Sequence, residues 1–237
     1  MNDIHSHFLP GIDDGCRDIS ESIKLLKQME EAGVKEIVLT PHYVVDSRYT
    51  CNVKNKKVIY DNLVKELKKE NINIKLYLGN EIFIHEDILE LLKKGEMESI
   101  NKSKYLLIEF PMMNYPTLAR NIFSELIYNG YTIILAHPER YIYVNKDISL
   151  LDEFMDMGVL LQGNYESLYG KYGSAAKKTL KKLLKKGYIS FLAGDIHHEV
   201  NKDLKNLRKK LKRYLSSDDI ENLLVNNFDK VVNNIDL

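Results

Sequence analysis

Tryptophan is absent from this sequence of 237 residues, and cysteine is nearly so, with only Cys16 and Cys51. Two cysteines are too few for a disulfide framework and are typical of a reducing compartment. No apolar run approaches the ~20 residues that a membrane-spanning helix needs. The N-terminus also lacks the basic and apolar regions of a signal peptide. We therefore expect a cytoplasmic, globular protein.

The chain also lacks an excess of either charge, because Lys and Arg total 34, as do Asp and Glu. A balanced chain without tryptophan and without interleaved aromatic and basic residues gives no support to nucleic-acid binding or to a nuclease. Linkers rich in proline, glycine or serine and low-complexity blocks are missing as well. With 44% hydrophobic residues, the chain is long enough for a sizeable core. We expect a single domain over residues 1–237.

Short apolar segments recur along the chain and are typical of strands. Seven of them cover residues 2–5, 36–40, 73–79, 105–110, 131–136, 158–163 and 188–194. Several are continuous runs of Ile, Leu and Val, as in strands buried on both faces of a parallel sheet. Most gaps between them carry the periodicity of amphipathic helices. This alternation predicts a parallel α/β domain, either a closed barrel or an open sheet.

Two of the predicted helices have informative patterns. In the segment 18–33, Asp18 is a candidate N-cap, Glu21 completes a pattern like a capping box, and Gly33 stands where a glycine commonly ends a helix. The segment 175–187 carries lysines on one side and apolar residues on the other. A membrane-surface helix can have this pattern, but an outer helix with its lysines in water explains it more simply.

Residue types that bind metals follow nearly every predicted strand at its C-terminal end. They are His5 and His7 with Asp13 and Asp14, then His42, Glu81, Glu109 and His137, and finally Asp195 with His197, while Asn164 follows the sixth strand. In parallel α/β folds these strand ends form the rim on which catalytic groups converge. Singly, each residue has an ordinary explanation, such as an Asx turn at Asp13. Together they exceed the needs of one ion and fit two or three, with zinc, manganese or iron suited to such ligands.

The motifs around these residues resemble those of a known superfamily. In chain order they read DIHSHFLPGIDDG, TPH, GNEI, LIEFP, AHPER and GDIH. They are similar to the successive motifs of the PHP (polymerase and histidinol phosphatase) superfamily. LIEFP, AHPERY and GNYESLYGKYG resemble most the manganese-dependent tyrosine-protein phosphatases encoded with bacterial capsule and exopolysaccharide genes. The resemblance implies a distorted (β/α)7 barrel with a trinuclear metal centre.

The resemblance also implies roles for individual residues. The family's metal ligands match His5, His7, Asp14, His42, Glu81, Glu109, His137, Asp195 and His197. Glu81 or Glu109 would bridge two ions, and Arg140 matches the arginine that holds the substrate phosphoryl group. The family has a second phosphate-binding arginine after its last Asp-x-His, whereas here the first arginine is Arg208. Lys202 or Lys205 would replace it, with a point charge in place of a bidentate fork.

The implied reaction is hydrolysis of phosphotyrosine by attack of a hydroxide that bridges the metal ions. The implied substrate is the tyrosine-rich tail of an autophosphorylating bacterial kinase that controls polysaccharide export. The implied cofactors are two or three divalent ions per chain, with manganese favoured and zinc, iron or magnesium as alternatives. A phenolic leaving group, with a pKa of about 10, needs little proton assistance, although His42 or His197 could deliver a proton through a metal-bound water.

Other functions compete with this one. A cysteine-dependent phosphatase has a C-x5-R motif, but Ser22 and Lys57 stand where Cys16 and Cys51 would need the arginine. A phosphatase for a small ester such as histidinol phosphate shares the metal site and stays open. A regulatory PHP protein of weakened activity also stays open, because the segment DIHHEVNK departs from the family pattern. Three residues near the motifs match no ligand position: His85, His198 and Glu199.

Overall fold

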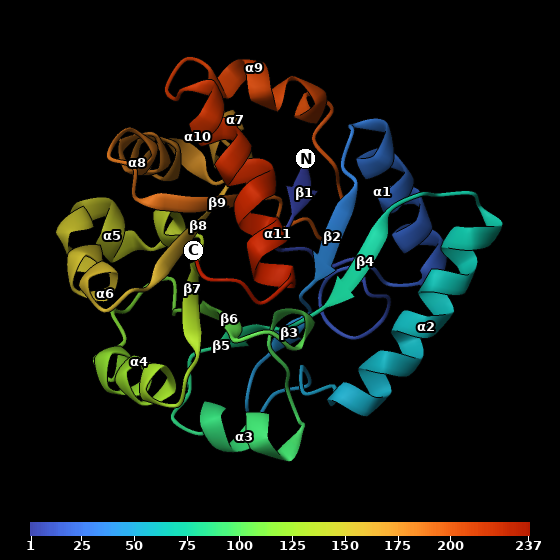
Figure 1. The fold of residues 1–237 in the computed structure, drawn as a ribbon, viewed down its shortest axis with the longest axis horizontal. Helices are drawn as coiled ribbons and strands as arrows, with labels where there is room; N and C mark the ends of the chain where they lie inside the picture. The colour runs from blue at the N-terminus through green and yellow to red at the C-terminus, as the bar shows by residue number, and fades with distance from the viewer.

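The computed structural model describes residues 1–237, with short strands in the middle of the molecule and helices around them (Figure 1). The strands are β1 (Asn2–Asp3), β2 (Glu36–Leu39), β3 (His42–Tyr43), β4 (Lys75–Leu78), β5 (Glu81–Phe83), β6 (Tyr105–Glu109), β7 (Thr132–Ala136), β8 (Leu160–Asn164) and β9 (Ile189–Ala193). All strand pairs are parallel. Each of the seven predicted segments overlaps a strand, although β8 ends one residue later than predicted, at Asn164, while β3 and β5 were not predicted.

The strands follow one another around a distorted barrel that is broken in two places. Hydrogen bonds join them in the orders β1-β2-β4 and β3-β5-β6-β7-β8-β9. Two residues separate β2 from β3, and two separate β4 from β5, so the second sheet continues two strands of the first. A parallel bridge between Ser6 and Ile196 joins the chain after β1 to the chain after β9. The predicted α/β barrel is confirmed, and its distortion lies at these two breaks.

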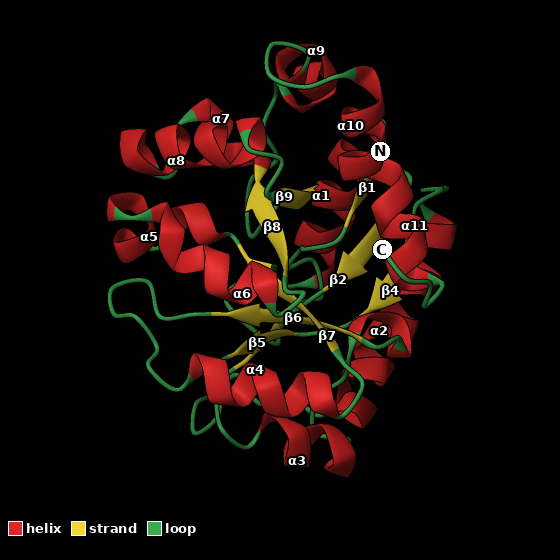
Figure 2. Ribbon diagram, turned by 60° about the vertical axis from the view of Figure 1, so that its left-hand side comes forward, coloured by secondary structure: helices red, strands yellow, loops and turns green.

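Helices surround the strands, as the view coloured by secondary structure shows (Figure 2). They are α1 (Ile19–Glu31), α2 (Val53–Lys69), α3 (Ile88–Lys94), α4 (Ala119–Tyr128), α5 (Ile142–Lys146), α6 (Asp152–Asp156), α7 (Tyr165–Tyr169), α8 (Gly173–Lys185), α9 (Leu207–Leu211), α10 (Ser217–Glu221) and α11 (Asn227–Val232). The predicted N-cap and terminal glycine of α1 are confirmed, because the Asp18 side chain accepts a hydrogen bond from the Glu21 N–H and Gly33 has φ of +86°. The capping box is not completed, because the Glu21 side chain accepts from the Arg17 N–H and not from that of Asp18. None of the helices combines the length and apolar character that crossing a membrane requires.

The core has two parts, one outside the barrel and one inside it. Along β6, Leu106 and Ile108 pack into the outer part, while Tyr105 and Leu107 belong to the inner part. This alternation follows from the period of two in a strand. The inner part also contains Phe228 and other residues of α11, a helix that lies across the barrel (Figure 1). Asn2 at the start of β1 donates a hydrogen bond to Asp229 of α11, and Tyr105 at the start of β6 donates one to Ile235 O just after this helix. Because α11 thus lies at the N-terminal ends of the strands, their C-terminal ends stay open for a site.

Candidate metal centre

The structure brings all nine predicted metal ligands together at the C-terminal ends of the strands. Eight of them form three overlapping groups with ligand atoms within 4.8 Å of one another: His7, Asp14, His42 and His197; His5, His7, Glu81 and Asp195; and His42, Glu81 and Glu109. The ninth is His137, whose Nε2 lies 2.9 Å from Glu81 Oε1 and 3.6 Å from Glu109 Oε1. Shared members join the three groups into one continuous cluster.

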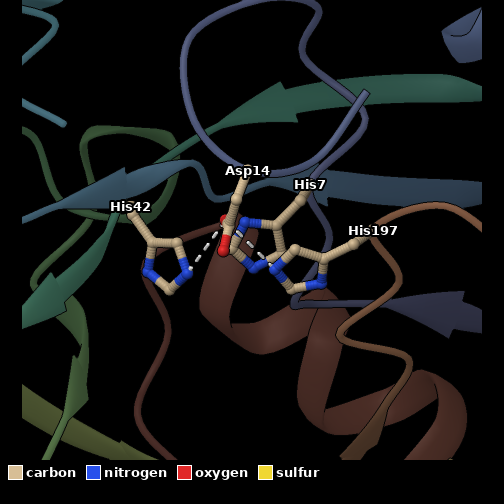
Figure 3. A group of neighbouring side chains, drawn as sticks. All are labelled: His7, Asp14, His42 and His197. Atoms are coloured by element: carbon tan, nitrogen blue, oxygen red, sulfur yellow. Dashed lines mark ion pairs between the residues drawn. The ribbon is translucent and has the colours of Figure 1, made fainter. Parts of the chain in front are cut away.

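His7, Asp14, His42 and His197 form the outer group (Figure 3). Asp14 projects between two imidazoles, with Oδ1 3.4 Å from Nε2 of both His42 and His197. The rings of His7 and His197 stack with their centroids 3.9 Å apart. A hydrogen bond with His197, together with the positive potential of the neighbouring histidines, lowers the pKa of Asp14 to about 2. The Asp14 side chain is 50% exposed, so the outer group reaches solvent at this residue.

The inner group, His5, His7, Glu81 and Asp195, is buried. Glu81 Oε2 lies 3.1 Å from His5 Nε2 and 3.3 Å from His7 Nε2. Asp195 Oδ1 lies 3.5 Å and 3.3 Å from the same two nitrogen atoms. Burial opposes the charged forms, yet attraction to the histidines holds the pKa of Glu81 and Asp195 well below their ordinary values. Two imidazoles and two ionised carboxylates therefore aim at one small volume.

The donor set fits divalent metal ions. Three buried atoms of the cluster have no hydrogen-bond partner, namely His42 Nδ1, Glu81 Oε2 and His137 Nδ1. Buried polar atoms without partners are rare in folded proteins, and these belong to residue types that ligate metals. Imidazole nitrogen and carboxylate oxygen together suit zinc, manganese and iron. Neither cysteine is among the grouped ligands.

Glu81 and Glu109 show why the cluster attracts a cation. The two side chains come from the paired strands β5 and β6, and His42 contacts both. Burial and the negative charge of Glu81 raise the pKa of Glu109 well above its ordinary value, while that of Glu81 is lowered. The protein's own histidines therefore compensate one carboxylate but not both. A bound divalent cation would supply the missing positive charge.

Two residues outside the predicted ligand set hold the histidine rings. His5 Nδ1 lies 2.8 Å from Gln162 Oε1, and His7 Nδ1 lies 2.8 Å from Asp13 Oδ2. Asp13 also accepts a hydrogen bond from the His42 N–H, at 3.0 Å. Such contacts fix the orientation of a metal-ligating imidazole. An Asx turn was one ordinary explanation of Asp13, and its Oδ1 does accept a hydrogen bond from the Gly15 N–H as well.

A buried lysine supports the breaks in the barrel. Lys56 of α2 is fully buried, and its Nζ donates hydrogen bonds to Gly79 O at 2.7 Å and Asn80 Oδ1 at 2.6 Å. The same Nζ lies 2.8 Å from Glu98 Oε1. Asn80 in turn donates to Pro41 O, at 3.1 Å. This network ties together the two breaks that directly precede His42 and Glu81. The sequence analysis missed it because a lysine within a lysine-rich helix carries no sign of burial.

Arg140 and Lys202 occupy different surroundings, although both were predicted to bind substrate phosphate. Arg140 Nη1 donates to Asp195 Oδ2 at 2.6 Å, and the guanidinium lies 4.4 Å from the centroid of the Tyr172 ring. With 24% of its side chain exposed, Arg140 stands at the edge of the cluster. Lys202 is exposed and lines a separate cavity of about 400 Å³ with Glu166, Lys171, Glu199 and Asn201. His85 and His198 pair with Asp87 and Glu21 and belong to none of the three ligand groups.

Comparisons with known proteins agree with this arrangement. A family described as "Capsular polysaccharide synthesis, CpsB/CapC" matches residues 1–233. The CapC protein of Staphylococcus aureus is 37% identical over 230 residues, covering 95% of this chain and 89% of the relative. The tyrosine-protein phosphatase YwqE of Bacillus subtilis is 34% identical over 198 residues, covering 84% of this chain and 78% of the relative.

Solved structures give the same result. One described as "Crystal structures of YwqE from Bacillus subtilis and CpsB from Streptococcus pneumoniae, unique metal-dependent tyrosine phosphatases" matches with a TM-score of 0.92 and 30% identity, covering 100% of this chain and 96% of the other. An amidohydrolase from Mycoplasma synoviae, with a TM-score of 0.58 and 16% identity, covers 98% of this chain and 87% of the other and shares the fold alone. The chain thus belongs to the CpsB/CapC family of capsular polysaccharide synthesis proteins, of the PHP type.

Proposed function

We propose that this protein is a metal-dependent protein-tyrosine phosphatase. The observation that carries the proposal is the cluster of nine histidines and carboxylates with Arg140 at its edge. The family's relatives support the substrate class, because several are named tyrosine-protein phosphatases. Phosphate monoester hydrolysis is among the slowest uncatalysed reactions in water, and a cluster of divalent ions is suited to it.

The cofactors are two or three divalent ions, with Mn²⁺ as our first choice. The three overlapping ligand groups support more than one ion, and Glu81 belongs to two of them. His5, His7, Glu81 and Asp195 would hold one ion in the buried part, and the outer group would hold another. When bound, such ions lower the pKa of water and neutralise charge on the phosphoryl oxygens.

Arg140 binds the phosphoryl group, because its remaining N–H groups are free to make charge-assisted hydrogen bonds. Asp195 and the ring of Tyr172 fix the guanidinium from two sides. A fixed positive charge costs little reorganisation when negative charge develops on the substrate. Of the cluster histidines, His42 and His197 have the most exposed side chains, 14% and 26%. We assign to them the delivery of any proton that the leaving phenolate takes up.

The substrate in the cell is the tyrosine-rich tail of an autophosphorylating bacterial kinase that controls polysaccharide export. The family description, capsular polysaccharide synthesis, supports this assignment. We treat residues 1–237 as one PHP domain, which is supported by a family match that extends over residues 1–233.

The test compares two substrates with and without metal. Protein stripped with a chelator is assayed on a phosphotyrosine peptide and on histidinol phosphate, before and after addition of Mn²⁺. We expect turnover of the peptide that depends on Mn²⁺, with little turnover of histidinol phosphate. Preference for histidinol phosphate would replace the proposal with a small-ester phosphatase. Bound metal without turnover of either substrate would point to a regulatory protein.

A further inference from the structure

Positive charge is concentrated in two segments of this neutral chain. Residues 171–186 and 202–213 contain 14 of the 34 Lys and Arg residues but only one of the 34 Asp and Glu residues, Asp203. The rest of the chain therefore has 20 basic and 33 acidic residues. A protein with zero net charge thus has one strongly positive region, formed by α8, α9 and the turns beside them.

The helices α8 and α9 lie on the same side of the barrel in Figures 1 and 2. Lys210 Nζ lies 3.8 Å from the centroid of the Tyr169 ring, and Lys181 Nζ lies 5.6 Å from that of Tyr214. Burial and the neighbouring charges of Lys177 and Arg213 lower the pKa of Lys210. These cations therefore repel one another at short range.

We name the basic face by five of its residues: Lys177, Lys181, Lys209, Lys210 and Arg213. None of the five forms an ion pair, and in the two segments only Arg208 does so, with Glu221. Lys209, Lys210 and Arg213 line a cavity of about 290 Å³ together with Tyr169, Asp203 and Asn206. Unpaired like charges around a hollow destabilise the folded chain slightly, and an anionic partner would relieve that repulsion.

The basic face is connected to the metal centre through a few contacts. Arg140 stacks on Tyr172, and Lys171 Nζ lies 5.7 Å from the same ring centroid. Tyr172 lies three residues after Tyr169, whose ring contacts Lys210. The cavity lined by Lys171 and Lys202 lies next to this path. A chain segment bound at Arg140 can therefore extend onto the basic face.

We propose that the basic face docks the acidic segment of a protein that carries the phosphotyrosine. This inference rests on the proposed function, and it adds a second contact region to the phosphoryl contact at Arg140. The argument is charge complementarity, because a phosphorylated segment with further phosphates or acidic residues is polyanionic. Such surface charges act mainly on encounter and register, so they change KM more than kcat.

An anionic membrane is the competing occupant, and the structure favours the peptide. The apolar residues of the two helices, such as Leu180, Leu183, Leu207 and Leu211, are buried in the core. None of the exposed large hydrophobic residues lies in either basic segment. The face therefore lacks the apolar side chains that insert a surface helix into a bilayer. A hollow with Tyr169 on its wall suits an extended acidic peptide better than a flat lipid surface.

The test neutralises three residues of the basic face and compares matched substrates. The variant Lys177→Gln/Lys210→Gln/Arg213→Gln is assayed with Mn²⁺ on a phosphotyrosine peptide flanked by Glu and Asp, on the same peptide with Gln and Asn, and on p-nitrophenyl phosphate. We expect KM for the acidic peptide to rise about tenfold, with kcat unchanged and the two substrates that lack acidic residues little affected. The control Lys54→Gln/Lys65→Gln/Lys68→Gln removes the same charge from α2, on another side of the barrel (Figure 1).

Binding of a fluorescein-labelled acidic phosphopeptide, followed by anisotropy, makes the test independent of turnover. Equal affinity of the wild type and the basic-face variant overturns the docking proposal, as does an equal loss in the α2 control. Intact docking without turnover of any phosphotyrosine peptide overturns the proposed function instead. Sedimentation with phosphatidylserine and phosphatidylcholine vesicles tests whether an anionic membrane occupies the basic face instead. Loss of binding to anionic vesicles in the variant, with unchanged peptide binding, assigns the face to a membrane.

Discussion

Charged side chains gather in two regions of this molecule, and the two regions treat charge in opposite ways. In the metal centre, opposite charges meet in contact and out of water, with the side chains of His5, Glu81 and Asp195 at most 2% exposed. In the basic face, like charges stand without partners at the surface. Charge interactions are strong where the effective dielectric constant is low, whereas salt screens exposed charges. Single changes should therefore have large effects in the first region and small, salt-dependent effects in the second.

The largest effect should come from Glu81→Gln, which removes one charge and keeps the shape. Glu81 Oε2 lies within 3.3 Å of nitrogen atoms of His5, His7 and His42, so its charge holds the groups together. We expect the variant to purify with less than the full complement of metal and to lose activity by at least about 100-fold. Metal content per chain and turnover of a phosphotyrosine peptide measure the two effects.

His85→Gln is the matched control for this prediction. His85 follows β5, as Glu81 begins it, but its imidazole pairs with Asp87 and lies outside the cluster. We expect full metal content and full activity. A Glu81→Gln protein with as much metal as the His85→Gln protein would show that the buried charge is not what holds the ions.

Glu139 combines a property of each region, because its carboxyl is buried like those of the metal centre but lacks a partner of opposite charge, like the lysines of the basic face. Its Oε1 accepts hydrogen bonds from Asn164 N and Ser167 Oγ, both at 2.8 Å, while Oε2 has no partner. Burial raises its pKa from 4.5 to about 7. Between these pH values the folded chain keeps a proton that the unfolded chain has released. The free energy of unfolding should therefore fall as pH rises through this range, by up to about 3 kcal/mol.

Glu139→Gln should remove this fall in the free energy of unfolding with rising pH. We subtract the free energy of unfolding of the wild type from that of the variant, so that the titration of all groups common to both proteins cancels. This difference should rise from pH 4.5 to 7 and stay constant above pH 7. Urea unfolding at several pH values measures the difference. Glu70→Gln, at an exposed position after α2, is the matched control for the chemical change. A flat difference for Glu139→Gln would mean that the carboxyl stays ionised in the folded protein.

Much of the metal centre was predictable because it depends on local patterns. Runs of Ile, Leu and Val locate the strands, and parallel strands end at the same rim. A histidine or acid just after a strand, such as His137 or Asp195, must therefore lie near the others. The motif resemblance then separates Asp14, a predicted ligand, from Asp13.

The remaining contacts could not be predicted because they depend on how distant segments pack. Gln162 lies in a strand and Lys56 in a lysine-rich helix, and neither position differs in sequence from an ordinary one. The strands β3 and β5 are only two and three residues long, too short to show a period. Lys202 was proposed from a missing arginine, whereas the structure gives it no contact with the cluster. The basic face was visible as two lysine-rich segments, but only the fold brings the segments together.

Asp13→Asn should have a smaller effect than the loss of a ligand, because Asp13 acts through His7 and His42. The change keeps the size of the side chain and removes the charge that faces His7 Nδ1 at 2.8 Å. We expect affinity for Mn²⁺ to fall by about 10- to 100-fold, with kcat much less changed once metal is saturating. Calorimetric titration of stripped protein measures the affinity. Asp18→Asn is the control, since Asn also caps a helix, and a loss of similar size there would mean that the whole loop has shifted.

The smallest effect should come from added salt, which we expect to weaken binding at the basic face and to leave the metal centre unchanged. Raising NaCl from about 50 to about 500 mM shortens the screening length to a few ångströms. We expect KM for the acidic phosphopeptide to rise by up to about tenfold, while the metal content stays constant because the ion pairs of the cluster are buried. The contact between Arg140 and the phosphoryl group is common to the acidic peptide and p-nitrophenyl phosphate, so the difference in their salt dependence isolates the basic face. The same salt dependence for both substrates would place the whole electrostatic contribution at Arg140 and the metal ions.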